Sequence, residues 1–389
     1  MASRFFDRFR IGAYYLQPNA RTEDHVKDLQ AAGIDLLIGI DMDRPLLDLL
    51  HRYGIGAVVS GVIPGWFGGD GANAGRMNEV NPWKSYQVGI DAFCDHPAIA
   101  GIDTGDEPSS LDFSYYGEVL ARLKAAFPEK LLYLNLYPSY GMLSANDPLQ
   151  TERELGTASY RAYLESYGRL IDLPYVSFDH YVCASDKERF LGDLLTVATY
   201  CQETQKQLHV VLQVNSREQD RLVSEEELCY QAFCALCYGA SAISWACYSA
   251  GWWHNQVLDR EGNRTEQYGK LKTVNRRLRR LTAEYSGYQW MGAEVICPAK
   301  SAQFGAFGSI AASAEVLMGK FVKTDGKTAI FLFFEGNSAS VGCQFSFQAE
   351  QGIRYRRQGS ADEVRLCPDA DGICRVEIPF CDACWIVAE

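Results

Sequence analysis

The feature that most constrains the fold is an alternation of short apolar runs and longer amphipathic stretches, which repeats eight times between residues 10 and 285. The apolar runs are rich in β-branched and aromatic residues and have the length of buried strands, whereas the stretches between them carry the apolar spacing of helices. Several of these stretches open with Ser or Thr followed by acidic residues and end in Gly, as capped helices do. The expected strands are residues 10–15, 35–40, 56–61, 98–103, 131–136, 175–179, 209–214 and 241–246.

Eight strand–helix units in unbroken succession predict an α/β fold, a (β/α)8 TIM barrel, over residues 1–288. Beyond about residue 290 the apolar residues alternate with period two, and Gly or Asp-Gly turns separate short runs. This change of period predicts a second domain, a C-terminal antiparallel β-sandwich, over residues 289–389. A chain of 389 residues has room for both.

Composition narrows the classes of partner. A formal net charge of −12 disfavours nucleic acid and anionic membrane, because both attract proteins with surplus Lys and Arg. The first residues contain no apolar signal segment, and no window reaches the roughly 18 apolar residues of a membrane helix. Thirteen cysteines without such a signal favour reduced thiols in the cytoplasm. The six histidines show no helical metal-binding spacing, so we expect no metal and no cofactor. The oligomeric state stays open, a homo-oligomer included.

Candidate site residues follow the strands, because the loops at the carboxyl ends of barrel strands build the active site. The segment 100–108 ends the fourth strand with three acids in quick succession, Asp103, Asp106 and Glu107. Carboxylates and amides are hydrogen-bond partners for sugar hydroxyls, and aromatic faces stack on sugar rings, so the inventory predicts a carbohydrate substrate. The other predicted site residues are Tyr15, Trp66, Asn135, Tyr137, Asp179, His180, Tyr181, Gln213, Trp245, Tyr248, Trp252 and Trp253.

The Gly-Asp-Glu-Pro motif at strand four and the barrel-plus-β layout resemble clan-A glycoside hydrolases, the group that contains β-galactosidases and cellulases. In that clan an Asn-Glu-Pro or similar sequence carries the acid/base glutamate, so the resemblance implies that Glu107 is the general acid. Asp106 stands where the clan usually has an Asn that contacts the sugar 2-hydroxyl. The clan's nucleophile is a glutamate at the end of strand seven, where this chain has Gln213 and Asn215. An amide cannot form the glycosyl ester of a retaining mechanism.

Three interpretations of the second carboxylate follow. In the favoured one it is Asp179 on strand six, acting as base or nucleophile. Strands four and six flank strand five, so their backbones lie ~9–10 Å apart, which suits the ~6.5–9.5 Å carboxyl separation of inverting enzymes. In the second, Asp103 or Asp106 assists Glu107. In the third, the barrel binds carbohydrate without hydrolysis or is a sugar lyase or isomerase. The leading prediction is a glycoside hydrolase, with sugar, anomer and exo or endo action left open.

Overall fold

A computed structural model describes residues 7–63, 74–140, 154–184, 186–249, 251–336, 339–347, 352–357 and 363–388. None of the helices in these ranges combines the length and the apolar character that crossing a membrane requires. By its internal contacts the chain divides into two compact units. The first holds residues 10–222 and 242–268, and the second holds residues 7–9, 223–241 and 269 onward.

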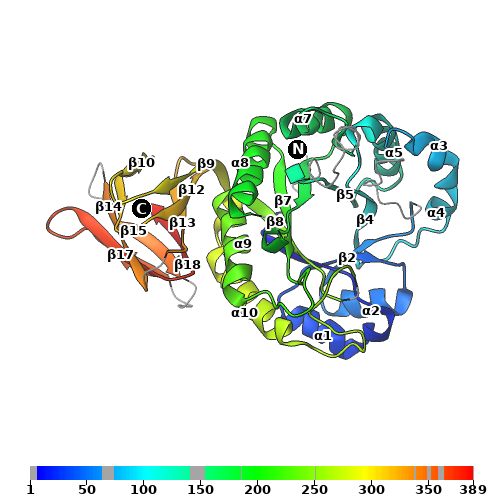
Figure 1. Cartoon of the computed structure of the whole chain (residues 1–389), viewed down its shortest axis with the longest axis horizontal. Coiled ribbons are helices and arrows are strands. Elements are labelled where there is room, and N and C mark those ends of the chain that lie inside the picture. Colours follow the sequence, from blue (N-terminus) through cyan, green and yellow to red (C-terminus); the bar gives the residue numbers. More distant parts are fainter. Residues whose placement is uncertain are drawn as a thin grey trace. The chain divides into compact units, whose positions relative to one another are not determined.

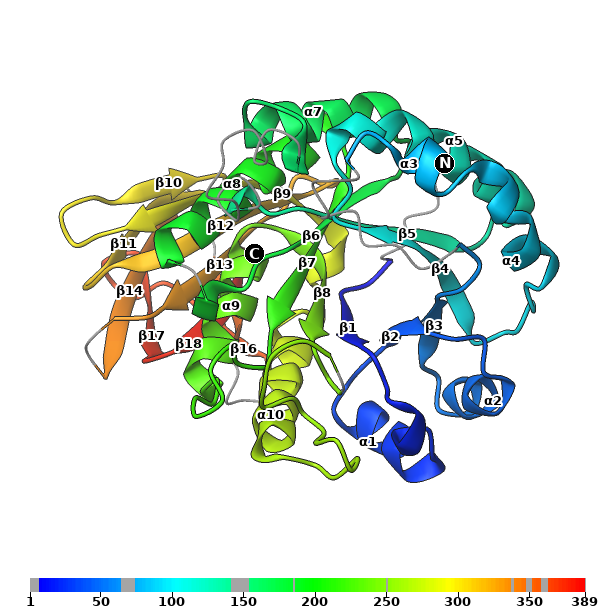
Figure 2. The ribbon, with the colours of Figure 1, turned by 45° about the vertical axis from the view of Figure 1, so that its right-hand side comes forward.

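Eight parallel strands close into a barrel in chain order, which confirms the predicted TIM barrel (Figure 1). β1 pairs with β2 on one side and with β8 on the other, so the sheet has no free edge (Figure 2). All eight predicted strands are present. They are β1 (Arg10–Tyr14), β2 (Leu36–Ile40), β3 (Gly56–Val59), β4 (Ile99–Asp106), β5 (Leu131–Leu136), β6 (Tyr175–Asp179), β7 (Gln207–Gln213) and β8 (Ala240–Ala246).

Helices follow the strands as the amphipathic stretches predict. Their N-terminal ends are fixed by side-chain caps: Thr22, Ser159 and Asp186 each accept a backbone N–H of the first turn, as N-cap residues do. The helices are α1 (Glu23–Ala31), α2 (Arg44–Arg52), α3 (Met77–Val80), α4 (Gln87–Asp91), α5 (Phe113–Ala126), α7 (Tyr160–Leu170), α8 (Lys187–Thr204), α9 (Glu225–Cys237) and α10 (Glu266–Leu281).

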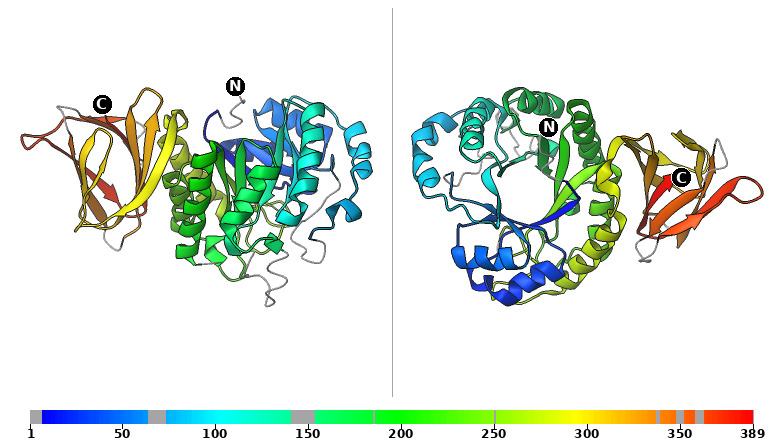
Figure 3. Two further views of the ribbon diagram at one scale, coloured as in Figure 1. Left: turned by 90° about the horizontal axis from the view of Figure 1, so that it is seen from above. Right: turned by 180° about the vertical axis from the view of Figure 1, so that it is seen from behind.

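The C-terminal part consists of antiparallel strands in two sheets, as predicted (Figure 3). Side chains from both sheets share one apolar core, which includes Phe307 and Phe345 from one sheet and Met318 and Ile386 from the other. The first sheet contains β10 (Ala302–Phe304), β11 (Phe307–Ala312), β14 (Ser340–Phe347) and β17 (Ile373–Pro379). The second contains β16 (Val364–Leu366), β15 (Ile353–Arg357), β18 (Asp382–Ala388), β13 (Thr328–Phe334), β12 (Val316–Lys323) and β9 (Tyr288–Ile296). The domain boundary at residue 288 stays a prediction.

Candidate active site

Strand β4 extends to Asp106 and is longer than its sequence pattern indicates. It continues past Asp103 because its pairing with β5 resumes after an irregularity, with Asp106 opposite Asn135. Glu107 comes next with φ 44°, and its backbone N–H donates to the carbonyl of Asn135 at 2.9 Å. Left-handed backbone is uncommon outside glycine and costs about 1–3 kcal/mol, so its occurrence at this acid marks a functional candidate.

Asn135 connects the carboxylates of the two neighbouring strands. Its Nδ2 donates to Asp106 Oδ1 at 3.1 Å and to Asp179 Oδ1 at 2.8 Å. Its Oδ1 accepts the hydroxyl of Ser177 at 2.9 Å, and the whole side chain is buried. Both polar atoms of the Asn135 amide are therefore hydrogen-bonded. Its Nδ2 holds one carboxylate from β4 and one from β6 next to β5.

The carboxyl groups of Glu107 and Asp179 hydrogen-bond to each other. Burial, followed by the charges of Asp179 and Asp106, raises the pKa of Glu107 well above its usual range. Burial and then the charge of Asp106 raise the pKa of Asp179 to about 7. The side-chain hydrogen bond between the two acids raises the pKa of Glu107 and lowers that of Asp179. The two acids therefore titrate as a pair, with both pKa values raised.

This contact differs from the spacing that the strand geometry predicts for an inverting pair. The estimate of ~9–10 Å concerns backbones, whereas the two side chains lean toward each other across β5. Glu107 leaves the strand with a left-handed φ, and Asn135 draws Asp179 toward β4.

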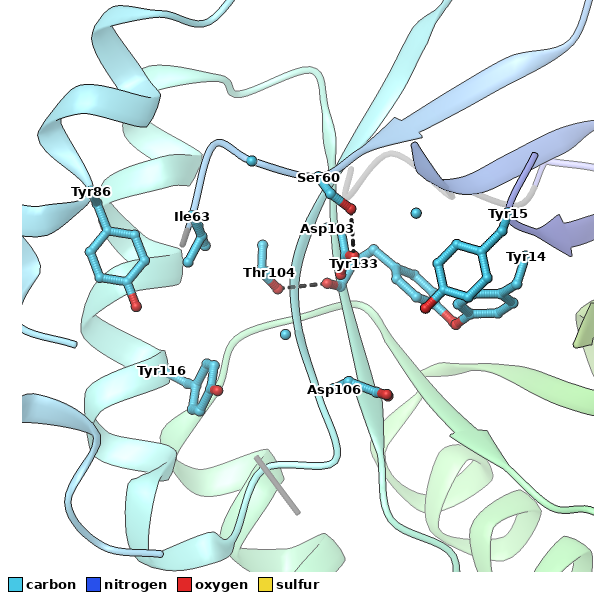
Figure 4. Close-up of a pocket in the computed structure, with 13 residues that line it drawn as sticks. Tyr14, Tyr15, Ser60, Ile63, Tyr86, Asp103, Thr104, Asp106, Tyr116 and Tyr133 are labelled. Atoms are coloured by element: carbon cyan, nitrogen blue, oxygen red, sulfur yellow. Dashed lines mark hydrogen bonds between the residues drawn. The ribbon is translucent and has the colours of Figure 1, made fainter. Parts of the chain in front are cut away.

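A cavity of about 340 Å³ is lined by Asp106, the residue before Glu107, whereas Glu107 and Asp179 are not among its lining residues (Figure 4). Asp103 faces it and accepts the hydroxyl of Ser60 at 3.0 Å. Burial and then the neighbouring charge of Asp106 raise the pKa of Asp103 to about 7, and burial raises that of Asp106 to about 6. Residues that line the cavity include Tyr14, Tyr15, Ser60, Asp103, Asp106 and Tyr133.

Aromatic side chains gather at the mouth of the barrel. Tyr15 contacts Trp252 at a ring-centroid distance of 6.2 Å, and Tyr181 contacts Trp252 at 6.1 Å and Trp253 at 5.2 Å. Tyr15 and Trp253 adopt left-handed backbone, with φ of 65° and 68°. Four of the predicted binding residues thus form one cluster, whose rings can supply the apolar faces that a sugar ring needs.

Other predicted residues lie in different surroundings. Tyr137 is buried, and after burial the charge of Glu107 is the largest influence that raises its pKa, so it lies close to the pair. His180 is fully buried and its Nδ1 lies 2.8 Å from Asp193 Oδ2. The Gln213 side chain donates to the carbonyl of Asn215 at 2.8 Å.

The predicted residues Trp245, on β8, and Tyr248, just after it, are both buried. Trp245 is wholly buried. Tyr248 is also buried, and after burial itself the side chains that influence its pKa include Tyr268 on α10 and Asp28 on α1, not Glu107 or Asp179. Trp66 lies outside the described residues. The substrate-binding roles of these residues stay predictions.

Sequence reasoning missed several groups near the pair. Glu154 is buried, and its charge contributes to the raised pKa of Glu107 although it lies 47 positions farther along the chain. Tyr140 lies close enough for Asp179 and Glu107 to raise the pKa of its phenol after burial has done so. No local pattern connects either residue with β4. Tyr133 is different, because it stands two positions before Asn135 on β5, and the period of two places both on one face.

No family model and no curated protein matches this chain in sequence. Among solved structures, a provisionally named α-L-fucosidase from Bacteroides thetaiotaomicron VPI-5482 is 12% identical and has a TM-score of 0.49, with 74% of this chain and 98% of that chain covered. An endo-β1,6-glucanase is 12% identical, with a TM-score of 0.48 and coverage of 98% and 91%. A GH10 endoxylanase from a sugarcane soil metagenome is 11% identical, with a TM-score of 0.45 and coverage of 70% and 98%. With TM-scores below 0.5, these likenesses assign neither an activity nor a residue role to this chain.

Proposed function

We propose that this protein is a glycoside hydrolase in which Glu107 is the general acid and Asp179 the second carboxylate. The observation that carries the proposal is the hydrogen-bonded pair that these residues form at the carboxyl ends of β4 and β6. Glycoside hydrolysis needs one carboxyl group that keeps its proton and a second that ionises, and burial with mutual charge gives the pair these properties. The adjoining cavity and aromatic cluster suit a carbohydrate substrate.

The proposed reaction begins when substrate enters between the two carboxyl groups and replaces their hydrogen bond. Glu107 donates its proton to the glycosidic oxygen as the bond to the anomeric carbon breaks. Retaining enzymes keep their carboxyl groups about 5–5.5 Å apart, whereas inverting enzymes need ~6.5–9.5 Å. The direct contact favours the shorter spacing, with Asp179 as nucleophile. The ionised Glu107 would then take a proton from the water that releases the sugar.

The pH dependence of activity follows from the two pKa shifts. Productive protonation requires an ionised Asp179 and a protonated Glu107. We expect kcat/KM to fall as the pH drops below about 7, because Asp179 gains a proton there. It should fall again at higher pH as Glu107 loses its proton. Initial rates between about pH 4 and about pH 10 would measure this bell. An optimum in the acid range near pH 4 would contradict the assignment.

The function is tested with a panel of nitrophenyl glycosides and natural oligosaccharides. We expect wild-type protein to release product from at least one of them, and Glu107→Gln to lower that rate by about 10²-fold or more, because the amide cannot donate the proton. Glu118→Gln, an exposed glutamate on α5, is the matched control and should keep full activity. Turnover that survives Glu107→Gln would refute the assigned acid. Carbohydrate binding with no turnover across the panel would instead indicate a binding barrel.

Asn135→Ala should lower kcat/KM by about 10–100-fold, since it removes the donor that Asp106 and Asp179 share. Without that donor the pKa of Asp179 rises further, so the acid limb of the pH profile should move to higher pH. Asn19→Ala removes an exposed amide that binds the carbonyl of Arg260, and it should leave the profile unchanged. An unshifted acid limb in Asn135→Ala would show that the amide does not position Asp179.

A further inference from the structure

The cavity next to Asp106 contains two acids without a basic residue in its described lining. Asp103 and Asp106 both line it, and its described lining contains no Lys, Arg or His. Among the described residues Asp103 is satisfied by Ser60 and the backbone of Gly105, and Asp106 by Asn135, with no ion pair to either. Asp103 and Asp106 are half-buried, and carboxylates partly withdrawn from water are costly to ionise unless a cation lies nearby. A bound cation would favour the ionised forms of these two acids, and the described lining of the cavity supplies none.

A buried hydroxyl in the same cavity also lacks a partner. Tyr116 lines the cavity from α5 and is 2% exposed, yet its hydroxyl forms no hydrogen bond with the described residues. A Cβ built on Gly105 would stand 3.1 Å from this hydroxyl oxygen, so the glycine leaves room next to it. Buried hydroxyls in proteins are almost always satisfied. The Tyr116 hydroxyl is thus a polar group of this lining that has no partner among the described residues.

Several tyrosines also line the cavity, and their ring faces attract cations. Figure 4 shows Tyr14, Tyr15 and Tyr133 on one side of the cavity, near Asp103 and Asp106. Tyrosine faces attract ammonium groups by about 0.5–2 kcal/mol at close range. A volume of about 340 Å³ lies at the small end of the range for small-molecule sites. The cavity thus combines the size for a sugar unit with two acids and several rings.

We propose that this cavity receives a sugar ring that carries a free amino group, with the ammonium held by the carboxylates of Asp103 and Asp106. The assignment rests on the proposed function, because it takes the cavity as part of the carbohydrate site. A neutral sugar could accept or donate hydrogen bonds here but would leave both acids without a counter-charge. An N-acetylated amine has no positive charge and would leave the same deficit.

The test compares matched monosaccharides by titration calorimetry with the full-length protein at neutral pH. Glucosamine is paired with glucose, galactosamine with galactose and mannosamine with mannose. N-acetylglucosamine, whose nitrogen is an uncharged amide, serves as a further control. We expect the amino sugar to bind about 10-fold tighter or more than its neutral partner in at least one pair, since charge-assisted hydrogen bonds favour it. Equal affinity within every pair, or no binding by any sugar, would overturn the proposal.

Variants separate the two acids from general charge effects. Asp103→Asn and Asp106→Asn should each reduce the preference for the amino sugar by about 10-fold while a neutral sugar loses little. Asp91→Asn removes the same charge from an exposed position on α4 and should keep the preference. A preference that survives in both cavity variants would refute the assigned acids. The wild-type comparison stands by itself if a cavity variant does not fold.

These experiments distinguish a failure of this inference from a failure of the proposed function. Hydrolysis of neutral glycosides that is lost in Glu107→Gln, without any preference for amines, would leave the proposed function intact and remove this inference. A strong amine preference without hydrolysis would leave the cavity assignment intact as a binding site and remove the proposed function.

Discussion

Asp179→Asn is expected to lower kcat/KM by at least about 10³-fold, the loss that follows when a nucleophile in a coupled group is removed. Asn has nearly the same shape, so it can still accept from Nδ2 of Asn135 as Asp179 does at 2.8 Å. It cannot carry the negative charge that attacks the anomeric carbon, and it no longer holds up the pKa of Glu107. The measurement is kcat/KM on the best substrate of the panel.

The same substitution should stabilise the fold above neutral pH. The pKa of Asp179 is about 7 in the folded protein against a usual value of 3.8. Because the pKa of Asp179 is higher in the folded than in the unfolded protein, its protonated form favours folding. This contribution to stability is fully present below the unfolded-state pKa and is lost as the pH rises through the folded-state pKa. Near pH 8 the wild-type protein holds a buried charge that Asn avoids, so the variant should be more stable by about 1–3 kcal/mol. Near pH 4 that difference should vanish.

Urea unfolding at both pH values checks the stability effect. Asp172→Asn is the matched control, because this exposed aspartate precedes β6 and forms a surface pair with Lys124 at 3.0 Å. Exposed ion pairs contribute about 0–1 kcal/mol to stability. This control should therefore change neither the activity nor the pH dependence of the free energy of unfolding. Full activity in Asp179→Asn would remove this residue from the mechanism. A variant that is less stable at alkaline pH would show that the carboxylate has a stabilising partner.

The barrel was predictable because each strand carries its own local signal. Runs such as residues 131–136 and 207–213 bury every or nearly every side chain, and this produces the continuous apolar patterns of parallel strands. Where β4 ends was not predictable from such a pattern. Its last residues, Gly105 and Asp106, are poor strand formers, and the pairing with Leu134 and Asn135 on β5 keeps them extended.

The candidate site was predictable in its components and less so in its arrangement. The position of Glu107 and Asp179 at strand ends follows from topology, since parallel strands bring their carboxyl ends together. Their contact depends on a left-handed φ at Glu107 and on the bridging amide of Asn135, which no spacing rule contains. Glu154 reaches the pair from outside any strand, so only tertiary structure could reveal it.

A second large effect is expected from Trp385→Ala in the six-stranded sheet. Trp385 lies on β18, between β15 and β13 in the sheet, and is 1% exposed. Its ring contacts Tyr285, Tyr288 and Phe321 at centroid distances of 5.4, 5.1 and 5.2 Å. Truncation removes these aromatic contacts and leaves a large void among rigid rings that cannot collapse into it. Such substitutions cost about 3–5 kcal/mol.

Hydrogen exchange followed by mass spectrometry would locate the loss within the second unit. We expect faster exchange in β12, β13 and β18, which flank the void, while β4 and β5 of the barrel keep their protection. Phe380→Ala is the aromatic control, because Phe380 stands only five positions earlier but is 48% exposed. Its removal should change the free energy of unfolding by no more than about 0.5 kcal/mol. A cost below about 1 kcal/mol for Trp385→Ala would mean that the surrounding rings repack, and the core of this sheet would then be less rigid than its contacts indicate.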